Sequence, residues 1–172
     1  QWAALGSAQA AGLTTDQMAA IASDDLSAIG TAAIRSFSSD QFAALTTDQM
    51  PNLVTRQLAA LTSVQVAGLD SEQIAAIESS DIRALSTAAL RSLSSDQLAG
   101  LSSDQIGQLS TGQVASLTTA QVNSLSSDDF NAFNTQQIAS LSTAQVGALS
   151  TDQLAAIESS DLAALGTRGM RA

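Results

Sequence analysis

The residue types that carry most enzyme chemistry are scarce in this sequence. It contains no His and no Cys among its 172 residues, so the commonest general base, the commonest metal ligand and the thiolate nucleophile are all missing. A zinc site is therefore not expected. Serine is abundant, but a serine nucleophile needs a partner base, and none is available. We expect no catalysis and no cofactor.

Two adjacent acidic pairs, Asp24-Asp25 and Asp128-Asp129, are the remaining candidates for chemistry. A dedicated Ca²⁺ loop places oxygen ligands at alternating positions, which neither pair does. Acid–base catalysis by paired carboxylates would require burial, whereas both pairs fall in the first turns of predicted helices. The glycines are scattered singly, so there is no phosphate-binding loop. We predict no metal site, and weak calcium binding at these turns stays open.

The charge of the chain limits its partners. Its formal net charge is −10, and all six cationic residues are Arg. This balance argues against binding to nucleic acid or to anionic membrane surfaces. No apolar run is long enough to span a membrane, so membrane insertion is not expected either. An unidentified protein or polymer partner and self-association both stay open.

An eight-residue repeat, or octad, runs through the whole chain. It is clearest where residues 93–100 (LSSDQLAG) are followed directly by residues 101–108 (LSSDQIGQ). Large apolar residues fall on two columns of the repeat. The leucine column recurs every eight residues from Leu5 to Leu165, and the second apolar column runs from Trp2 to Met170, with Ala10 as its one small member. Such self-similarity decides the fold prediction.

The octad does not fit a continuous helix or a strand. In an unbroken α-helix eight residues advance about two turns plus roughly 80°, so the apolar stripe would rotate around the helix and form no seam. In a strand the alternating spacings of five and three would send successive apolar residues to opposite faces. The other residues, mostly Ala, Gln, Asp and Ser, are also poor strand formers. A β-solenoid is the second choice.

A chain of short helices, one in each octad, satisfies the pattern. With Ser94 as N-cap, Gln97 is the third helical residue and completes a capping box, while Leu93 and Leu98 form a hydrophobic staple. Asp96 lies in the first turn, where the helix dipole favours negative charge. The column after Ser94, the hydroxyl column, is Ser or Thr in every repeat. This strict column leaves two other interpretations open: the cap lies one residue later, or the hydroxyl bonds a neighbouring repeat.

Isolated two-turn helices are unstable, so the helices must stack into a one-dimensional solenoid. We predict an all-α superhelix of two-turn helices, with two helices in each coil as the preferred winding and three as the alternative. Small residues before each leucine would allow close backbone approach. The glutamine column, which contains Gln97, serves either as a ladder of side-chain amides or for capping alone. Pro51 falls inside a predicted helix and should distort it.

Three segments share a variant of the octad in which Asp replaces the column Gln. In each, the next repeat carries Ala or Gly in that column and Arg two residues later. The pattern predicts an Asp–Arg bridge between adjacent helices, against the plainer interpretation of a local polar substitution. The predicted structural pairs are Asp25–Arg35, Asp81–Arg91 and Asp161–Arg171.

The units at residues 45–50 (LTTDQM), 117–122 (LTTAQV) and 77–82 (IESSDI) resemble the octad arrays of very large bacterial exported or surface-associated proteins, sometimes labelled adhesins. The resemblance covers the whole chain and implies an extracellular or cell-surface setting. Haem binding, another label of such proteins, lacks support because the chain has no His, Cys or Tyr.

Together these observations predict one continuous array over residues 1–172, which we interpret as a piece of a longer array. The expected function is structural, as a spacer, stalk or scaffold of a large bacterial surface protein. The alternatives are an adhesin-like module that binds a protein or polymer, and a segment of a self-assembling filament. The scattered deviations from the repeat favour the spacer over the binding module.

Overall fold

A computed structural model describes residues 2–158, 161–163 and 165. Within this part of the chain every regular element is a short helix, and no strand occurs. The elements are η1 Trp2–Ala4, α1 Ser7–Ala11, α2 Thr15–Ala19, α3 Ser23–Leu26, α4 Thr31–Ser36, α5 Ser39–Ala43, η2 Met50–Asn52, α6 Thr55–Leu58, α7 Ser63–Ala67, α8 Ser71–Ala75, η3 Ile82–Ala84, α9 Thr87–Arg91, α10 Ser95–Ala99, α11 Ser103–Gly107, α12 Thr111–Ser116, α13 Thr119–Ser124, α14 Ser127–Asn131, α15 Thr135–Ala139, α16 Thr143–Gly147 and α17 Thr151–Ala156.

The helices begin where the cap residues predict. Ser94 has extended backbone angles of φ −66° and ψ 164°, and its side chain accepts a hydrogen bond from the backbone N–H of Gln97. The prediction that the helix is interrupted in each octad is confirmed, and a cap one residue later is wrong for this repeat. Because the extended cap and the leucine before it take part of each octad, the α-helices are short, as the six residues of α12 illustrate.

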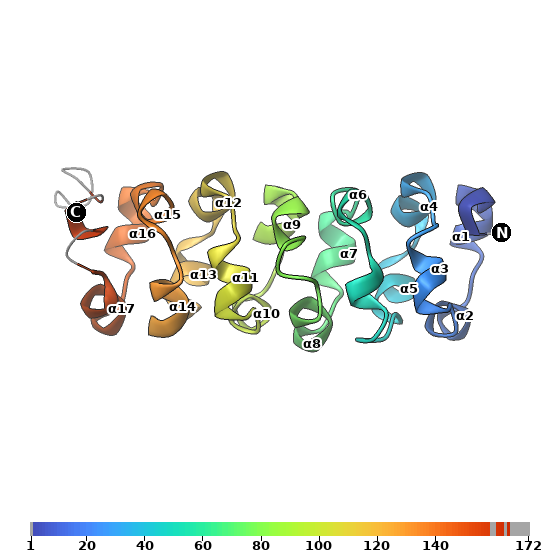
Figure 1. Ribbon diagram of the computed structural model, residues 1–172, viewed down its shortest axis with the longest axis horizontal. Helices are drawn as coiled ribbons and strands as arrows, with labels where there is room; N and C mark the ends of the chain where they lie inside the picture. The colour runs from blue at the N-terminus through green and yellow to red at the C-terminus, as the bar shows by residue number, and fades with distance from the viewer. Residues whose placement is uncertain (1, 159–160, 164, 166–172) are drawn as a thin grey trace.

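The short helices wind into a long rod (Figure 1). The preferred winding of two helices per coil is wrong, because the elements that pack on each other are three octads apart, as α1 with α4, α10 with α13 and α14 with α17. Hydrogen bonds between turns also join residues well over 16 positions apart, for example Ser7 Oγ with Ala32 O and Gln121 Nε2 with Leu93 O. One turn of the superhelix therefore takes somewhat more than three octads.

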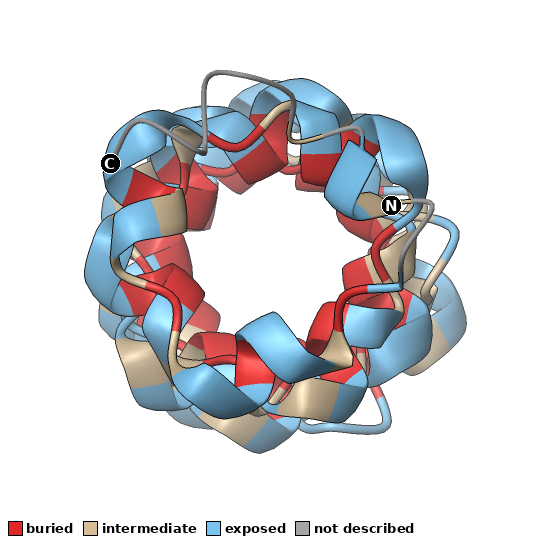
Figure 2. Cartoon of the chain, turned by 90° about the vertical axis from the view of Figure 1, so that its left-hand side faces the viewer, coloured by how far each residue is buried: buried red, intermediate tan, exposed pale blue. Residues whose placement is uncertain are grey.

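Both apolar columns face the axis of this superhelix. Seen end-on, the buried residues lie on the inner side of the ring of helices and the exposed residues on the outer side (Figure 2). Leu98 and Ile106 of the second apolar column are fully buried, and Leu101 of the leucine column is 3% exposed. Each such side chain stabilises the fold by about 1.5–3 kcal/mol. The wider winding follows from this burial, since the inward side chains of both columns must share one interior.

Small residues allow successive turns to approach closely, as the sequence predicts. A Cβ atom added to Gly100, which directly precedes a leucine of the leucine column, would lie 3.0 Å from the Cβ atom of Ser71 on the preceding turn. A Cβ atom added to Gly68 would likewise lie 3.1 Å from the Cβ atom of Ser39. The column before each leucine thus packs on the hydroxyl column of the turn before, which explains why both columns contain small residues.

The distortion predicted at Pro51 is present. This residue lies in the 3-10 helix η2, which replaces the α-helix of its octad. Another 3-10 helix within the array, η3, was not anticipated. It contains no proline and follows Asp81, one of the residues that replace the column glutamine.

Two glycines inside helices provide a test of the close packing between turns. No atom lies within 4 Å of a Cβ added to Gly112, so Gly112→Ala should stabilise the fold by about 0.5–1 kcal/mol through helix propensity. A Cβ added to Gly107 would lie 3.1 Å from the backbone oxygen of Ala132, so Gly107→Ala should destabilise the fold despite the same gain in propensity. Urea unfolding followed by circular dichroism measures both. Equal stabilisation by the two variants would contradict this packing.

Candidate functional site

The glutamine column holds the most regular polar side chains of the molecule. Gln121, at the start of α13, is 2% exposed. Its Oε1 accepts a hydrogen bond from the backbone N–H of Thr118 at 2.9 Å, and its own N–H donates to Thr118 Oγ1 at 3.1 Å. These bonds satisfy two N–H groups at the start of the helix that have no intrahelical partner.

The amide nitrogen of the same side chain reaches the preceding turn of the superhelix. Gln121 Nε2 donates to the backbone oxygens of Leu90 at 3.1 Å and Leu93 at 2.9 Å. Leu90 belongs to the last turn of α9, where carbonyl groups lack intrahelical partners. One glutamine therefore joins the N-terminus of its own helix to the C-terminus of a helix on the turn before.

This arrangement recurs along the rod. Each glutamine of the set donates through Nε2 to the carbonyl of the leucine column 28 residues earlier: Gln41, Gln49, Gln57, Gln65, Gln73, Gln97, Gln105, Gln113, Gln121, Gln137, Gln145 and Gln153. Gln9 and Gln17 lie within the first 28 residues, so the sequence contains no residue 28 positions before them, and both are exposed. Neither alternative for this column is right as stated, because the amides bond backbone carbonyls of the preceding turn and not one another, and they also cap their own helices.

An aspartate in the glutamine column makes a different bond to the preceding turn. Asp129 Oδ1 accepts from Ser103 Oγ at 2.9 Å, while its Oδ2 accepts from Ser126 Oγ at 2.7 Å. Asp81 and Asp161 accept in the same way from hydroxyls 26 residues earlier. An ionised carboxylate carries no hydrogen that it could donate to a carbonyl, so it accepts a hydrogen bond from the hydroxyl column instead. Bonding of these hydroxyls to a neighbouring repeat was one of the alternatives that the sequence left open.

Three of the six residues predicted to form Asp–Arg bridges make other contacts in the structure. Asp81 accepts from Thr55 Oγ1, and Asp161 accepts from Thr135 Oγ1. Arg35 donates through Nε to the backbone oxygen of Ala60. The bridges Asp25–Arg35 and Asp81–Arg91 are not tested by these contacts and stay predictions. The third, Asp161–Arg171, involves a residue outside the described part of the chain.

The repeat matches a known family model. The model for the ALTTAQ repeat matches residues 18–55, 74–111 and 123–156, which together make up more than half of the chain. The chain belongs to the ALTTAQ repeat family. Comparison with curated proteins and with solved structures finds no match. The family and the helical solenoid identify the chain as a structural repeat module.

The described residues of this ALTTAQ array contain no cluster of three or more His, Cys, Asp or Glu side chains that could hold a metal ion. Over the same residues, no helix combines the length and the apolar character that crossing a membrane requires.

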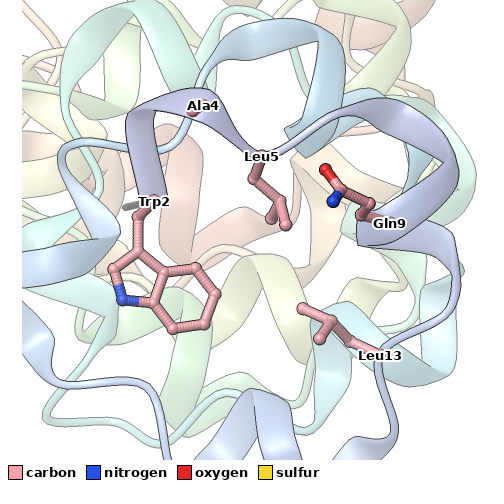
Figure 3. A pocket seen from close by; sticks show the side chains of 5 residues that line it. All are labelled: Trp2, Ala4, Leu5, Gln9 and Leu13. Carbon is pink, nitrogen blue, oxygen red and sulfur yellow. The ribbon is translucent and has the colours of Figure 1, made fainter.

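A pocket of about 420 Å³ opens at the first turn, where Trp2, Leu5, Leu13 and the side chain of Gln9 converge (Figure 3). Trp2 and the two leucines belong to the apolar columns, and no turn of described residues packs on their outer side. The pocket is thus an open end of the core. We assign no ligand to it.

A second pocket lies on the side of the rod, between α4 and α6. It measures about 450 Å³ and is lined by Thr31, Ala32, Arg35, Arg56, Ala59 and Ala60. Arg35 and Arg56 each donate a hydrogen bond to a backbone carbonyl, those of Ala60 at 3.2 Å and Ser27 at 2.6 Å. Two oriented guanidinium groups in one pocket can bind a carboxylate or another oxyanion. Sequence analysis missed this site because the two arginines are brought together only by the winding.

The bonds that glutamine makes between turns can be tested with a matched pair of variants. Gln121→Glu keeps an acceptor for Thr118 N–H, but it replaces the buried donor with a charge facing two carbonyl oxygens. We expect a loss of about 3 kcal/mol in the free energy of unfolding. Gln17→Glu, at an exposed position that makes only the capping bonds, should change it by less than about 0.5 kcal/mol. Chemical denaturation compares the two, and similar losses would contradict the role of the amide nitrogen.

The aspartate variant of the column gives the reverse test. Asp129→Gln restores a donor for the carbonyls of Leu98 and Leu101 at the end of α10, at the cost of the bond to the exposed hydroxyl of Ser103. We expect an increase of about 1 kcal/mol in the free energy of unfolding. A shift of the urea midpoint to higher concentration would confirm it. A lower midpoint would show that the Ser103–Asp129 bond outweighs the carbonyl bonds.

Proposed function

We propose that this ALTTAQ array is a mechanical spacer, a rod whose length grows with the number of octads. The observation that carries the proposal is the recurrent bond between turns, in which each glutamine of the set reaches a carbonyl 28 residues earlier. Each turn is therefore bonded to the turn before by the same buried contact. A solenoid of this kind has contacts only between neighbouring turns, so it elongates without changing its cross-section.

Its composition fits a structural role better than a chemical one. The polar residues that the fold buries are column glutamines, together with Asp129, and these are used in bonds within and between turns. The outer surface carries Ser, Thr and acidic side chains, which keep a long array soluble. The bacterial extracellular setting is supported by the resemblance of the octads to surface-protein arrays. Antibody labelling of intact, unpermeabilised source cells tests that setting directly.

Small-angle X-ray scattering tests the rod. Insertion of a second copy of residues 61–156, which is a whole number of octads, keeps every bond between turns in register. Because packed helices lie about 8–10 Å apart, the few added turns should lengthen the particle by about 30–40 Å with an unchanged cross-sectional radius. A wider particle of unchanged length would show that the array folds back on itself and would contradict the spacer.

A second candidate function is a binding module for a protein or polymer. The observation that favours it is the Arg35–Arg56 pocket on the side of the rod. A pull-down or glycan array with the full chain tests this function. A specific partner whose binding is lost in Arg35→Glu/Arg56→Glu would favour the binding module over the plain spacer.

A further inference from the structure

Two opposite edges of the rod differ in charge. Helices α1, α4, α6, α9, α12 and α15 lie along the upper edge in Figure 1, and none of them has an acidic residue in its first turn. Arg35, Arg56 and Arg91 lie on α4, α6 and α9 of this edge, and all three are exposed. We call it the arginine edge.

The opposite edge is acidic. Helices α2, α8, α10, α14 and α17 lie along the lower edge in Figure 1, and every one of them has an acidic residue in its first turn. These residues are Asp16, Glu72, Asp96, Asp128, Asp129 and Asp152. We call this edge the acidic edge. The two edges make the rod complementary to itself when one copy lies beside another.

The Arg35–Arg56 pocket is the most developed part of the arginine edge. Its two guanidinium groups come from neighbouring turns, since α4 and α6 pack on each other. The bonds to Ala60 O and Ser27 O each use one N–H group of an arginine, which has five, and hold the side chain in place. The remaining N–H groups suit carboxylate oxygens, and holding the arginines beforehand lowers the entropy cost of binding them.

The period of the charges identifies the partner as a second copy. On the arginine edge the pocket joins two helices three octads apart, and on the acidic edge Glu72 and Asp96 lie on α8 and α10, which are also three octads apart and packed together. In each pair, therefore, the two helices that carry the charges are one turn of the superhelix apart. An unrelated acidic polymer would share this spacing only by coincidence, whereas a second copy has it by construction.

We propose that rods associate side by side, with Glu72 and Asp96 of one copy facing Arg56 and Arg35 of another. The net charge of −10 does not prevent this contact, because salt at physiological ionic strength screens charges more than about 8 Å apart. In this arrangement the acidic edge of each copy faces the arginine edge of the next, so the association extends into a sheet or bundle of spacers.

Sedimentation velocity of the full chain over a wide concentration range, at 150 mM NaCl as the low-salt condition and 500 mM NaCl as the high-salt condition, tests the proposal. We expect association at low salt that weakens at high salt. Arg35→Glu/Arg56→Glu and Glu72→Arg/Asp96→Arg should each weaken it by at least about tenfold, because like charges then face each other. An equimolar mixture of the two variants should associate again, since each restores the complement of the other. Circular dichroism checks that both variants are folded.

Asp40→Arg/Asp104→Arg is the matched control. It makes the same change in net charge as Glu72→Arg/Asp96→Arg, but on α5 and α11, which belong to neither edge. It should associate at least as strongly as the natural sequence. A loss equal to that of Glu72→Arg/Asp96→Arg, a mixture that fails to associate, or a monomer at every concentration in low salt would overturn the proposal. Binding of poly-L-glutamate by a chain that stays monomeric would point to an acidic partner instead and would also overturn it.

Discussion

The fold depends on the side-chain amide of the column glutamine, whose oxygen and nitrogen both make hydrogen bonds. In each regular octad the oxygen of the column glutamine satisfies the start of its own helix, and its nitrogen satisfies the end of a helix on the preceding turn. Helices this short have most of their backbone groups at their termini, where intrahelical partners are missing. The glutamine supplies those partners from inside the structure, where water has little access, since residues such as Gln57 are fully buried. The apolar columns provide the burial, and the amides fix how one turn lies on the next.

The chemistry of the amide explains which substitutions the column contains. Glutamine is long enough to reach a carbonyl and carries both a donor and an acceptor, whereas aspartate is shorter and accepts only. Where Asp129 or Asp81 stands in the column, the contact with the preceding turn changes from a carbonyl to the hydroxyl of Ser103 or Thr55. The hydroxyl column is thus the alternative partner where these aspartates replace the glutamine. The exchange keeps a bond between turns at these positions while adding a negative charge.

Winding converts a variable position of the repeat into a pattern on the surface. The residue before the column glutamine varies along the sequence with no evident order. Once wound, five octads that carry Asp or Glu there, those of α2, α8, α10, α14 and α17, line one edge of the rod. Octads without an acid there, such as those of α6 and α9, line the opposite edge, and the acids of α5 and α11 lie on neither. Arg35 and Arg56, which are separated in sequence, share a pocket for the same reason. An ALTTAQ array can therefore vary the charge of its edges without any change to its core.

Local signals in the sequence were sufficient for the helix starts, the burial of both apolar columns, the small residues between turns and the distortion at Pro51. The helix starts depend on contacts within one octad. The other features depend on residue types with a strong structural preference: large apolar residues for the interior, small residues for close contacts, and proline for interrupted helices. The number of octads in a turn was not determined in this way, and the expected winding of two was wrong. That number depends on how the inward side chains of several octads fill a common interior, which is a property of the assembled superhelix. The bond from each glutamine to a carbonyl 28 residues away, the hydroxyl partners of the aspartates and the two charged edges all follow from the winding. The octad by itself therefore determined what each residue does within its own helix, and only the tertiary structure decided which distant residues meet, because the pitch of the superhelix sets those distances.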